Sequence, residues 1–183
     1  MSDLEDFSDL LCYALLRHRL CLCEGLGAPE PMLVGVRRDR IGFVSPIVDH
    51  ETGRFRDGMD AEESIHELAS FAAVARMDRW AIVTPIMLPG GVVGRMGVEV
   101  TAYRHTGQTG SVWTVPLARD DDGIDQLVGA QRRLRRPTAR QSSWFQNCVT
   151  QRRRDKELTF KSLRVFLERA DEHYDYVIPW ITE

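Results

Sequence analysis

The sequence contains almost no lysine. Lys156 and Lys161 are the only lysines among its 24 basic residues, so the other 22 are arginines. A planar guanidinium group binds phosphates and carboxylates in a bidentate manner, which an ammonium group cannot do. Because arginines occur along the whole chain, the overall excess fits the base composition of a GC-rich gene. Only a local cluster of arginines therefore indicates a binding surface.

The chain also has few cysteines, and they show no metal-binding pattern. They are Cys12, Cys21, Cys23 and Cys148. No two of them form a CxxC pair, and no histidine follows at the spacing of a zinc ligand. We therefore expect no metal site, and small buried thiols in a reducing compartment.

Long apolar runs are absent. No segment reaches the ~18 consecutive apolar residues that a membrane-spanning helix needs. The N-terminal MSDLEDFSDLL is acidic, whereas a signal peptide begins with positive charge. These two absences predict a cytoplasmic protein without a membrane partner.

The short signatures of common catalytic sites are missing too, including GxSxG, HExxH and a cysteine–histidine pair. The glycine-rich PGGVVGRMG has no Lys-Ser or Lys-Thr after it and precedes a strand-like segment, so we interpret it as a hairpin loop. Asp49-His50-Glu51 is typical of a polar turn. Asp120-Asp121-Asp122 lacks the alternating ligands of a calcium loop and suits a helix N-cap. The sequence thus predicts no cofactor.

What is present describes a globular domain. The 183 residues are 43% hydrophobic, which suffices for a core without disulfides. Hydrophobic periodicity, capping boxes and turn residues predict the order α-β-β-α-β-β-β-α-α-α. We therefore expect an α+β fold, with an antiparallel sheet of about five strands flanked by helices. Residues 1–136 would form the α+β core domain, and residues 137–183 a C-terminal helical extension packed on the core.

Several local signals define these elements. MLVGVRR and RIGFVSPIV predict a hairpin connected around Arg38-Asp39-Arg40, and MGVEVTAYRH with SVWTVPLA predicts another. Asp60-x-x-Glu63 is a capping box for a helix that runs to about Met77. In the strand-like WAIVTPIML, Pro85 favours a sheet edge or a bulge. The apolar ending YVIPWITE is expected to dock on the core, after a helix with Tyr174 on its buried face.

The predicted element order over roughly residues 3–136 is similar to that of roadblock/longin-type dimerisation domains. No residue motif carries this similarity, so it assigns no site. The first helix adds an independent hint of self-association. Its main apolar face is joined by a second apolar strip on the opposite side, made of Tyr13, Leu16 and Leu20. A helix that is apolar on two faces is sandwiched between layers or lies in a subunit interface, so a homodimer is one expectation.

The most unusual stretch is AQRRLRRPTARQSSWFQNCVTQRRRD, which begins at Ala130. Residues 131–161 carry a net charge of +8 while the whole chain carries −3. Pro137 and a capping box at Ser143 divide the stretch into two helices, the first starting at about Ile124. Trp144 and Phe145 fit a core stripe better than a base-stacking surface. The candidate partner-binding residues are Arg132, Arg133, Arg135, Arg136, Arg140, Arg152, Arg153 and Arg154.

These observations lead to three functional hypotheses. The first is a non-enzymatic binding or assembly protein, whose arginine-rich helical surface engages an anionic macromolecule, either nucleic acid or an acidic protein surface. The second is a small cytosolic enzyme with a site on the polar strand faces, built from His105, Tyr103, Glu99 and Asp49. The third is a structural subunit of a virion or secretion machine. The sequence names no catalytic residue for the second.

Overall fold

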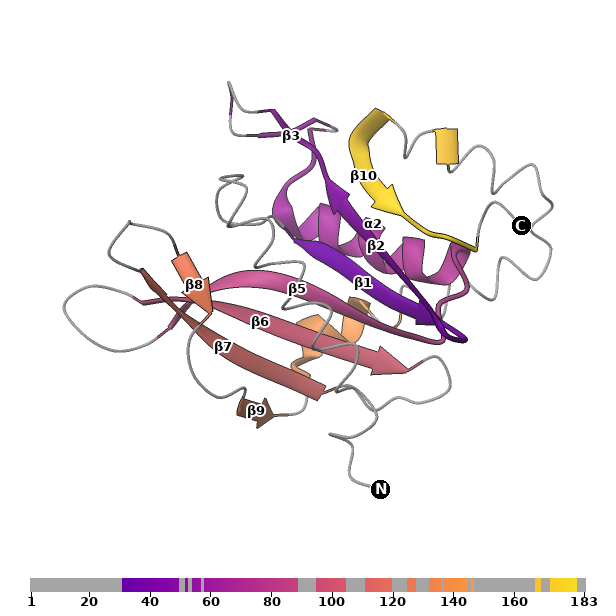
Figure 1. Ribbon diagram of the computed structural model, residues 1–183. Coiled ribbons are helices and arrows are strands. Elements are labelled where there is room, and N and C mark those ends of the chain that lie inside the picture. Colours follow the sequence, from indigo (N-terminus) through magenta and orange to yellow (C-terminus); the bar gives the residue numbers. More distant parts are fainter. Residues whose placement is uncertain are drawn as a thin grey trace.

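The computed structural model describes residues 31–49, 52, 54–56, 58–88, 95–104, 111–119, 125–127, 132–135, 137–144, 146, 167–168 and 172–180 (Figure 1). The strands are β1 (Met32–Arg37), β2 (Arg40–Pro46), β3 (Val48–Asp49), β4 (Arg54–Phe55), β5 (Arg79–Leu88), β6 (Arg95–Arg104), β7 (Ser111–Arg119), β8 (Asp125–Leu127), β9 (Arg132–Arg135) and β10 (Tyr174–Val177). Helix α2 spans Ala61–Val74, and residues 139–144 are also helical.

One antiparallel sheet organises the described part of the chain. Eight strands form it, in the order β10-β2-β1-β5-β6-β7-β8, and β9 also pairs with β7. Strands β3 and β4 form a separate small hairpin. The predicted α+β class and antiparallel sheet are confirmed, but "about five" strands was too few and the predicted order of elements was wrong after β7.

Helix α2 covers one face of the sheet at β1, β2 and β5 (Figure 1). Its capping box is present: Asp60 Oδ1 accepts from the backbone N–H of Glu62 and Glu63 at 2.8 and 2.9 Å, and Glu63 Oε2 accepts from the Asp60 N–H at 3.0 Å. Reciprocal capping satisfies N–H groups that have no partner inside the helix. The buried side of the helix, including Leu68 and Phe71, packs on the core that Leu33, Trp80 and Ile82 provide.

The opposite face of the sheet is buried as well. Met32 and Val34 on β1, Ala81 and Val83 on β5, and Val100 on β6 are all nearly inaccessible to solvent. A strand buried on both faces consists of a nearly continuous apolar run, which explains why MLVGV and WAIV show no alternation of polar and apolar residues. The sheet is therefore an internal layer of the fold.

Pro85 lies in β5 beyond Val83, the last residue of that strand that pairs with β1. Strand β1 pairs with β5 only from Val83 to Arg79, so β5 has no β1 neighbour at Pro85. Its described neighbour there is β6, through the Pro85↔Val98 position. The residues that precede Pro31 lie outside the described part of the chain, so the expected edge or bulge at Pro85 stays a prediction.

The C-terminal segment docks on the core, as its apolar composition predicts. Tyr174 packs edge-on against Phe71, with ring centroids 5.1 Å apart, and its hydroxyl donates to Glu67 at 3.0 Å. The indole N–H of Trp180 donates to the carbonyl of Ala75 at 2.7 Å. Residues 174–177 form strand β10 on the edge of β2, whereas Tyr174 was predicted to lie on the preceding helix. Its aromatic and β-branched residues suit a strand, and β2 offers an unpaired edge.

The segment after β7 differs most from the prediction. Residues expected in a helix from about Ile124 form strands β8 and β9, both paired with β7. Arginine and leucine favour helices in isolation, but backbone pairing with an available strand edge overrides such weak propensities. The next helical segment is capped by Thr138 and Gln141, upstream of the predicted cap at Ser143: Gln141 N donates to Thr138 Oγ1 at 3.2 Å, and Thr138 N donates to Gln141 Oε1 at 2.9 Å.

The proposed division of the chain at residue 136 stays a prediction. Within the described residues, no helix is long and apolar enough to cross a lipid bilayer.

Candidate functional site

A buried polar cluster on β6 brings together two residues of the enzyme hypothesis. Glu99, Thr101 and Tyr103 alternate along the strand and therefore share its α2-facing side. Gln141 links all three: its amide nitrogen donates to Glu99 Oε1 at 2.6 Å and to Thr101 Oγ1 at 3.1 Å, and its backbone carbonyl accepts from the Tyr103 hydroxyl.

The environment of Tyr103 makes it a structural donor. Its ring stacks on Trp80 with centroids 4.4 Å apart, and only 2% of the residue is exposed. Burial raises the pKa of Tyr103 far above its usual range, and the nearby Glu99 carboxylate raises it further. The phenol is therefore protonated at every physiological pH. Its proton is committed to Gln141, so this arrangement holds the helical segment on the sheet.

The other two residues of the enzyme hypothesis do not join the cluster. Asp49 accepts a hydrogen bond from the Thr52 N–H at 3.1 Å in the β3–β4 turn, where Asp49-His50-Glu51 was predicted to be a polar turn. His105 lies outside the described residues. No group of three or more histidine, cysteine, aspartate or glutamate side chains capable of holding a metal ion occurs in the part of the chain that the structure describes.

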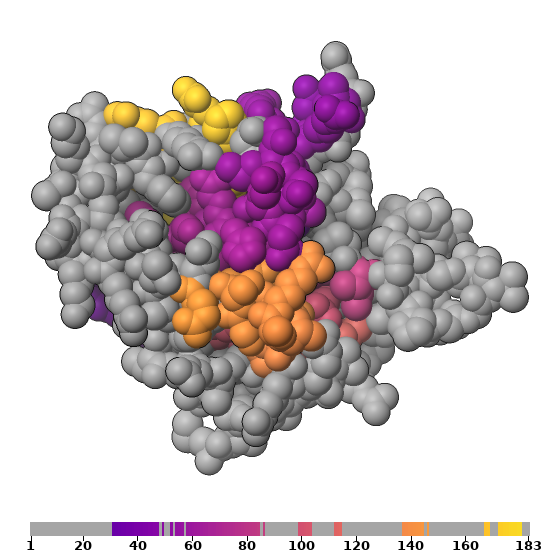
Figure 2. Space-filling model, turned by 180° about the vertical axis from the view of Figure 1, so that it is seen from behind, coloured from indigo at the N-terminus to yellow at the C-terminus, as the bar shows by residue number. Residues whose placement is uncertain are grey.

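A second cluster surrounds Glu62 at the start of α2. Glu62 Oε2 accepts from Arg140 Nε at 2.7 Å and from a second nitrogen of the same guanidinium. Glu62 Oε1 accepts from the Trp144 indole N–H at 3.1 Å and lies 3.4 Å from His66 Nε2. Figure 2 shows the segment beginning at Pro137 (orange) directly against the region of α2 (purple). Arg140 is thus engaged in an intramolecular ion pair.

Trp144, whose indole N–H donates to Glu62, is a core residue. It is 3% exposed and is part of the main hydrophobic core. An indole that is this inaccessible cannot stack on a nucleic-acid base, so the prediction of a core residue is confirmed. Phe145 lies outside the described residues.

Glu62 should make stability depend on pH. The hydrogen bond from Arg140 holds the pKa of Glu62 below its usual value, although burial opposes this. A carboxylate whose pKa is lower in the folded state stabilises the fold above its unfolded-state pKa, and this contribution is lost as pH falls through the folded-state value. We expect Glu62→Gln to destabilise the protein near neutral pH, by an amount that shrinks toward zero as pH falls below about 4.

Urea unfolding of the wild type and Glu62→Gln across this pH range measures the effect. Glu62→Ala also deprives the buried Trp144 indole of its acceptor, so it should retain a cost of about 1–3 kcal/mol at low pH, where the cost of Glu62→Gln has vanished. A wild-type-minus-Gln difference that does not change with pH would contradict the assignment of Arg140 as the main cause.

A second set of residues places arginines at one end of the sheet. We call it the arginine rim and define it as Arg37, Arg38, Arg40, Arg76, Arg79 and Arg104. Register places two arginine pairs directly opposite each other, Arg37↔Arg40 between β1 and β2, and Arg79↔Arg104 between β5 and β6. The Arg37 and Arg40 positions lie on the α2-facing side of the sheet, whereas the Arg79 and Arg104 positions lie on its opposite side. The two pairs therefore share an end of the sheet but not a face.

Two residues of the arginine rim also have an unusual backbone conformation. Among the described residues other than glycine, Arg38 and Arg76 alone have a positive φ, 53° in each case. Arg38 occupies the β1–β2 turn, and its N–H donates to Asp78 Oδ2 at 2.9 Å. Left-handed conformation costs a non-glycine residue about 1–2 kcal/mol. Glycine, asparagine or aspartate usually takes such a turn position, so arginine here is unexpected on structural grounds alone.

Arg76 follows the end of α2 in a Schellman motif. The N–H of Met77 donates to the Ala72 carbonyl at 3.0 Å, and the N–H of Arg76 donates to the Ala73 carbonyl at 2.9 Å. The left-handed residue of this motif is most often glycine. Both left-handed positions of the rim therefore carry a charged side chain where a glycine would be less strained.

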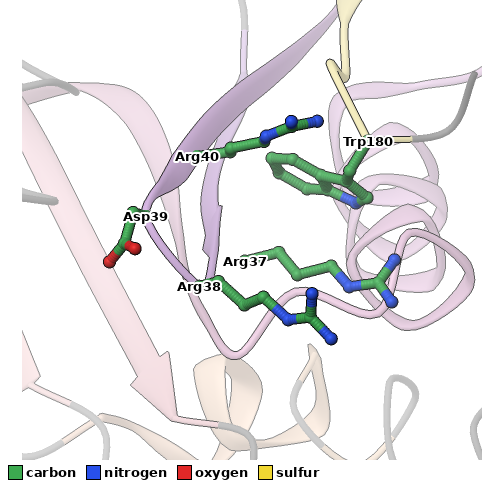
Figure 3. Close-up of a pocket in the computed structure, with 5 residues that line it drawn as sticks. All are labelled: Arg37, Arg38, Asp39, Arg40 and Trp180. Atoms are coloured by element: carbon green, nitrogen blue, oxygen red, sulfur yellow. The ribbon is translucent and has the colours of Figure 1, made fainter. Parts of the chain in front are cut away.

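The rim borders a pocket of about 350 Å³, lined by Arg37, Arg38, Asp39, Arg40 and Trp180. Figure 3 shows the guanidinium groups of Arg37, Arg38 and Arg40 on the side of Trp180, and the Asp39 carboxylate turned away from them. Arg40 also donates to the carbonyl of Pro179 at 3.4 Å. The pocket therefore combines three cationic groups with an aromatic wall that the docked C-terminal segment supplies.

The arginines predicted to bind a partner lie in different parts of the structure. Arg132, Arg133 and Arg135 lie on strand β9, so their predicted presentation on a helix is wrong. Arg140 is paired with Glu62, as described above. Outside the described residues lie Arg136, Arg152, Arg153 and Arg154, together with the predicted interface residues Tyr13, Leu16 and Leu20. Their assignments stay predictions.

Sequence reasoning recognised Arg38-Asp39-Arg40 only as a hairpin connection. One signal could have drawn attention to it: arginine occupies turn positions that normally favour small or turn-forming residues. The opposition of Arg79 and Arg104 could not be read locally, because it depends on the register between β5 and β6.

Comparisons with known proteins gave no match. No protein-family model, curated protein or solved structure matches this chain. The similarity to roadblock/longin-type domains consequently rests on predicted element order alone, and strands β8 and β9 depart from that order.

Proposed function

We propose that this protein is a non-enzymatic binding or assembly protein that engages an anionic macromolecule through the arginine rim. The observation that carries the proposal is the concentration of arginines at one sheet end, in two directly opposed pairs and at two left-handed positions. The two left-handed positions cost stability in the isolated chain. The concentration of arginines raises the local positive potential, which would attract an anionic partner.

Chemistry supports arginine rather than lysine for this role. A guanidinium fork forms two parallel hydrogen bonds with a phosphate or carboxylate, so several of them fix the orientation of a partner as well as attract it. The chain as a whole is acidic, at −3, so a strong positive potential has to come from a local cluster. Further contacts with the same partner would come from Arg132, Arg133, Arg135, Arg136, Arg152, Arg153 and Arg154.

The enzyme hypothesis receives less support from the geometry. Glu99 and Tyr103 do converge, but both are hydrogen-bonded to Gln141. The pocket is lined by neither of them. A substrate would have to displace Gln141 before reaching either group, whereas the rim arginines already border a pocket.

A charge-matched comparison of variants tests the proposal. Arg38→Gln/Arg40→Gln removes two rim charges, and Arg54→Gln/Arg56→Gln removes two exposed charges from the β3–β4 hairpin. Binding of single-stranded DNA, RNA and polyglutamate is measured by fluorescence anisotropy over a range of salt concentrations. We expect the rim variant to bind its preferred anion about 10-fold or more weakly, with a salt slope smaller by roughly one for each phosphate that the variant no longer binds.

The control variant should retain wild-type affinity and salt slope. Equal weakening of both variants would reduce the effect to net charge and overturn the rim as the site. Failure of the wild type to bind any of the three polyanions at low salt would overturn the proposed function.

A further inference from the structure

We infer that the face of the sheet opposite α2 is a docking surface for residues 1–30 of the same chain, which lie on it through one apolar stripe of a helix. The inference is separate from the arginine rim and does not depend on the proposed function. It assigns an occupant to a face on which the described residues place no helix.

This opposite face is buried over most of its width. Its positions on β1, β5, β6 and β7 are at most 2% exposed and include Met32, Val34, Ala81, Val83, Val100 and Trp113. Cross-strand register places these side chains on one side of the sheet. Both described helical segments pack on the other side, α2 against Leu33 and Ile82, and residues 139–144 through Gln141. The structure contains a single chain, so a segment of that chain beyond the described ranges covers this face.

Burial of the same face decreases toward β2 and β10. Ile41 and Phe43 are half-buried, and Val177 is 48% exposed. Phe43 is paired with Val34 on one side and with Val177 on the other, so the covering segment ends beside Phe43. It extends over four strands, which span about 14 Å at a spacing of about 4.8 Å. An α-helix with its side chains is about 10–12 Å wide, so one helix that crosses the strands obliquely suffices.

Chain connectivity favours residues 1–30 over residues 147–166, the other long segment outside the described ranges. Residues 1–30 lead through Pro31 directly into β1, which lies within the covered area. Residues 147–166 are anchored at both ends on the α2 side, because Trp144 and Tyr174 belong to the core that packs on α2. To reach the opposite face, that segment would have to pass around a sheet edge twice.

The sequence of residues 1–30 supplies a matching surface. One apolar stripe at helical spacing consists of Leu4, Phe7, Leu11, Leu15 and Leu22. A helix over these residues is about 28 Å long at about 1.5 Å per residue, which exceeds the width of the covered area. With this stripe on the sheet, the second apolar strip of Tyr13, Leu16 and Leu20 lies on the side of the helix away from it.

Photo-crosslinking of the full chain tests the occupant. Benzoylphenylalanine replaces Phe43, which borders the covered area, or Tyr176, which is also partly buried but lies on the α2-facing side of the sheet. We expect the group at position 43 to crosslink to peptides of residues 1–30, and the group at position 176 to crosslink to none of them. A mixture of heavy-isotope and unlabelled chains should give crosslinks within one chain only. Crosslinks between two chains, crosslinks to residues 147–166, or no crosslink from position 43 would overturn the inference.

A matched pair of variants tests the stripe. Leu11→Ser/Leu15→Ser alters it, and Leu16→Ser/Leu20→Ser makes the same change on the opposite side of the helix. Each is combined with Val83→Cys on the covered face, and alkylation of the new thiol under native conditions is followed by peptide mass spectrometry. We expect only the first variant to speed this alkylation, by about tenfold or more, because a weakened cover opens locally.

Ile82→Cys is the control reporter for the α2-facing side of the same strand, where alkylation should stay slow in both variants. Equal alkylation rates at position 83 in the two serine variants would overturn docking through this stripe. Equal acceleration at positions 82 and 83 would show that the changes loosen the whole core, which would overturn a docking surface confined to one face.

Discussion

Replacing Trp80 with alanine is expected to lower the free energy of unfolding by about 3–5 kcal/mol, the range for truncating a buried aromatic side chain. Trp80 is fully buried at the centre of the sheet. It lies opposite Gly35 on one side and opposite Tyr103 on the other. The Tyr103 ring would no longer have an aromatic ring to stack on, and the cavity would open in the core between the sheet and α2. Urea unfolding monitored by far-UV circular dichroism measures the loss of stability.

Trp80→Phe is the matched control. The Trp80 indole N–H is buried without a hydrogen-bond partner among the described residues, so phenylalanine removes a buried unsatisfied donor together with some volume. These effects oppose each other, and we expect a loss below about 1.5 kcal/mol. A phenylalanine variant as unstable as the alanine variant would show that the indole N–H, and not the volume of the ring system, stabilises the core.

The sequence predicted best those elements whose signals are local. The capping box at Asp60, the tight connection around Arg38-Asp39-Arg40 and the hairpin of β6 and β7 all depend on residues close together in the chain. Strand β9 could not be predicted in this way. Its RRLR sequence has helical propensity, and only the exposed edge of β7 makes it a strand.

The candidate site likewise combines features with local sequence signals and features that depend on long-range strand pairing. Arginines were identified as the relevant chemistry from composition, but the segment with most of them was interpreted as two helices. The rim depends on register and topology: Arg37 and Arg40 are near in sequence, whereas Arg79 and Arg104 are brought together by the pairing of two long strands. Trp180 joins the pocket only because β10 crosses to the edge of β2. No local pattern contains that information.

The structure also explains why a small residue is needed at two opposed positions of the first hairpin. Gly35 and Gly42 face each other in the β1–β2 register. A Cβ on Gly35 would lie 1.9 Å from the sulfur of Met77, the flexible part of a side chain. A Cβ on Gly42 would lie 2.8 Å from the backbone carbonyl oxygen of Val177 and 3.0 Å from the Trp180 ring. The first clash repacks a methionine, whereas the second pushes the C-terminal segment off the sheet.

Gly42→Ala is therefore expected to detach residues 174–180 and to open the pocket, at a cost of about 1–3 kcal/mol for overpacking. Detachment removes the hydrogen bond between Arg40 and Pro179 and the aromatic wall of the pocket, so binding through the rim should weaken while the remaining sheet stays folded. Hydrogen exchange of β10, read by mass spectrometry, should become faster in Gly42→Ala and remain slow in Gly35→Ala, although both variants are less stable than the wild type. Because a ligand that binds only the docked form must stabilise it, a polyanion bound at the rim should slow exchange of β10 in the wild type. Faster exchange of β10 in both variants alike would mean that the segment reports global stability and is not held specifically by the close approach at Gly42.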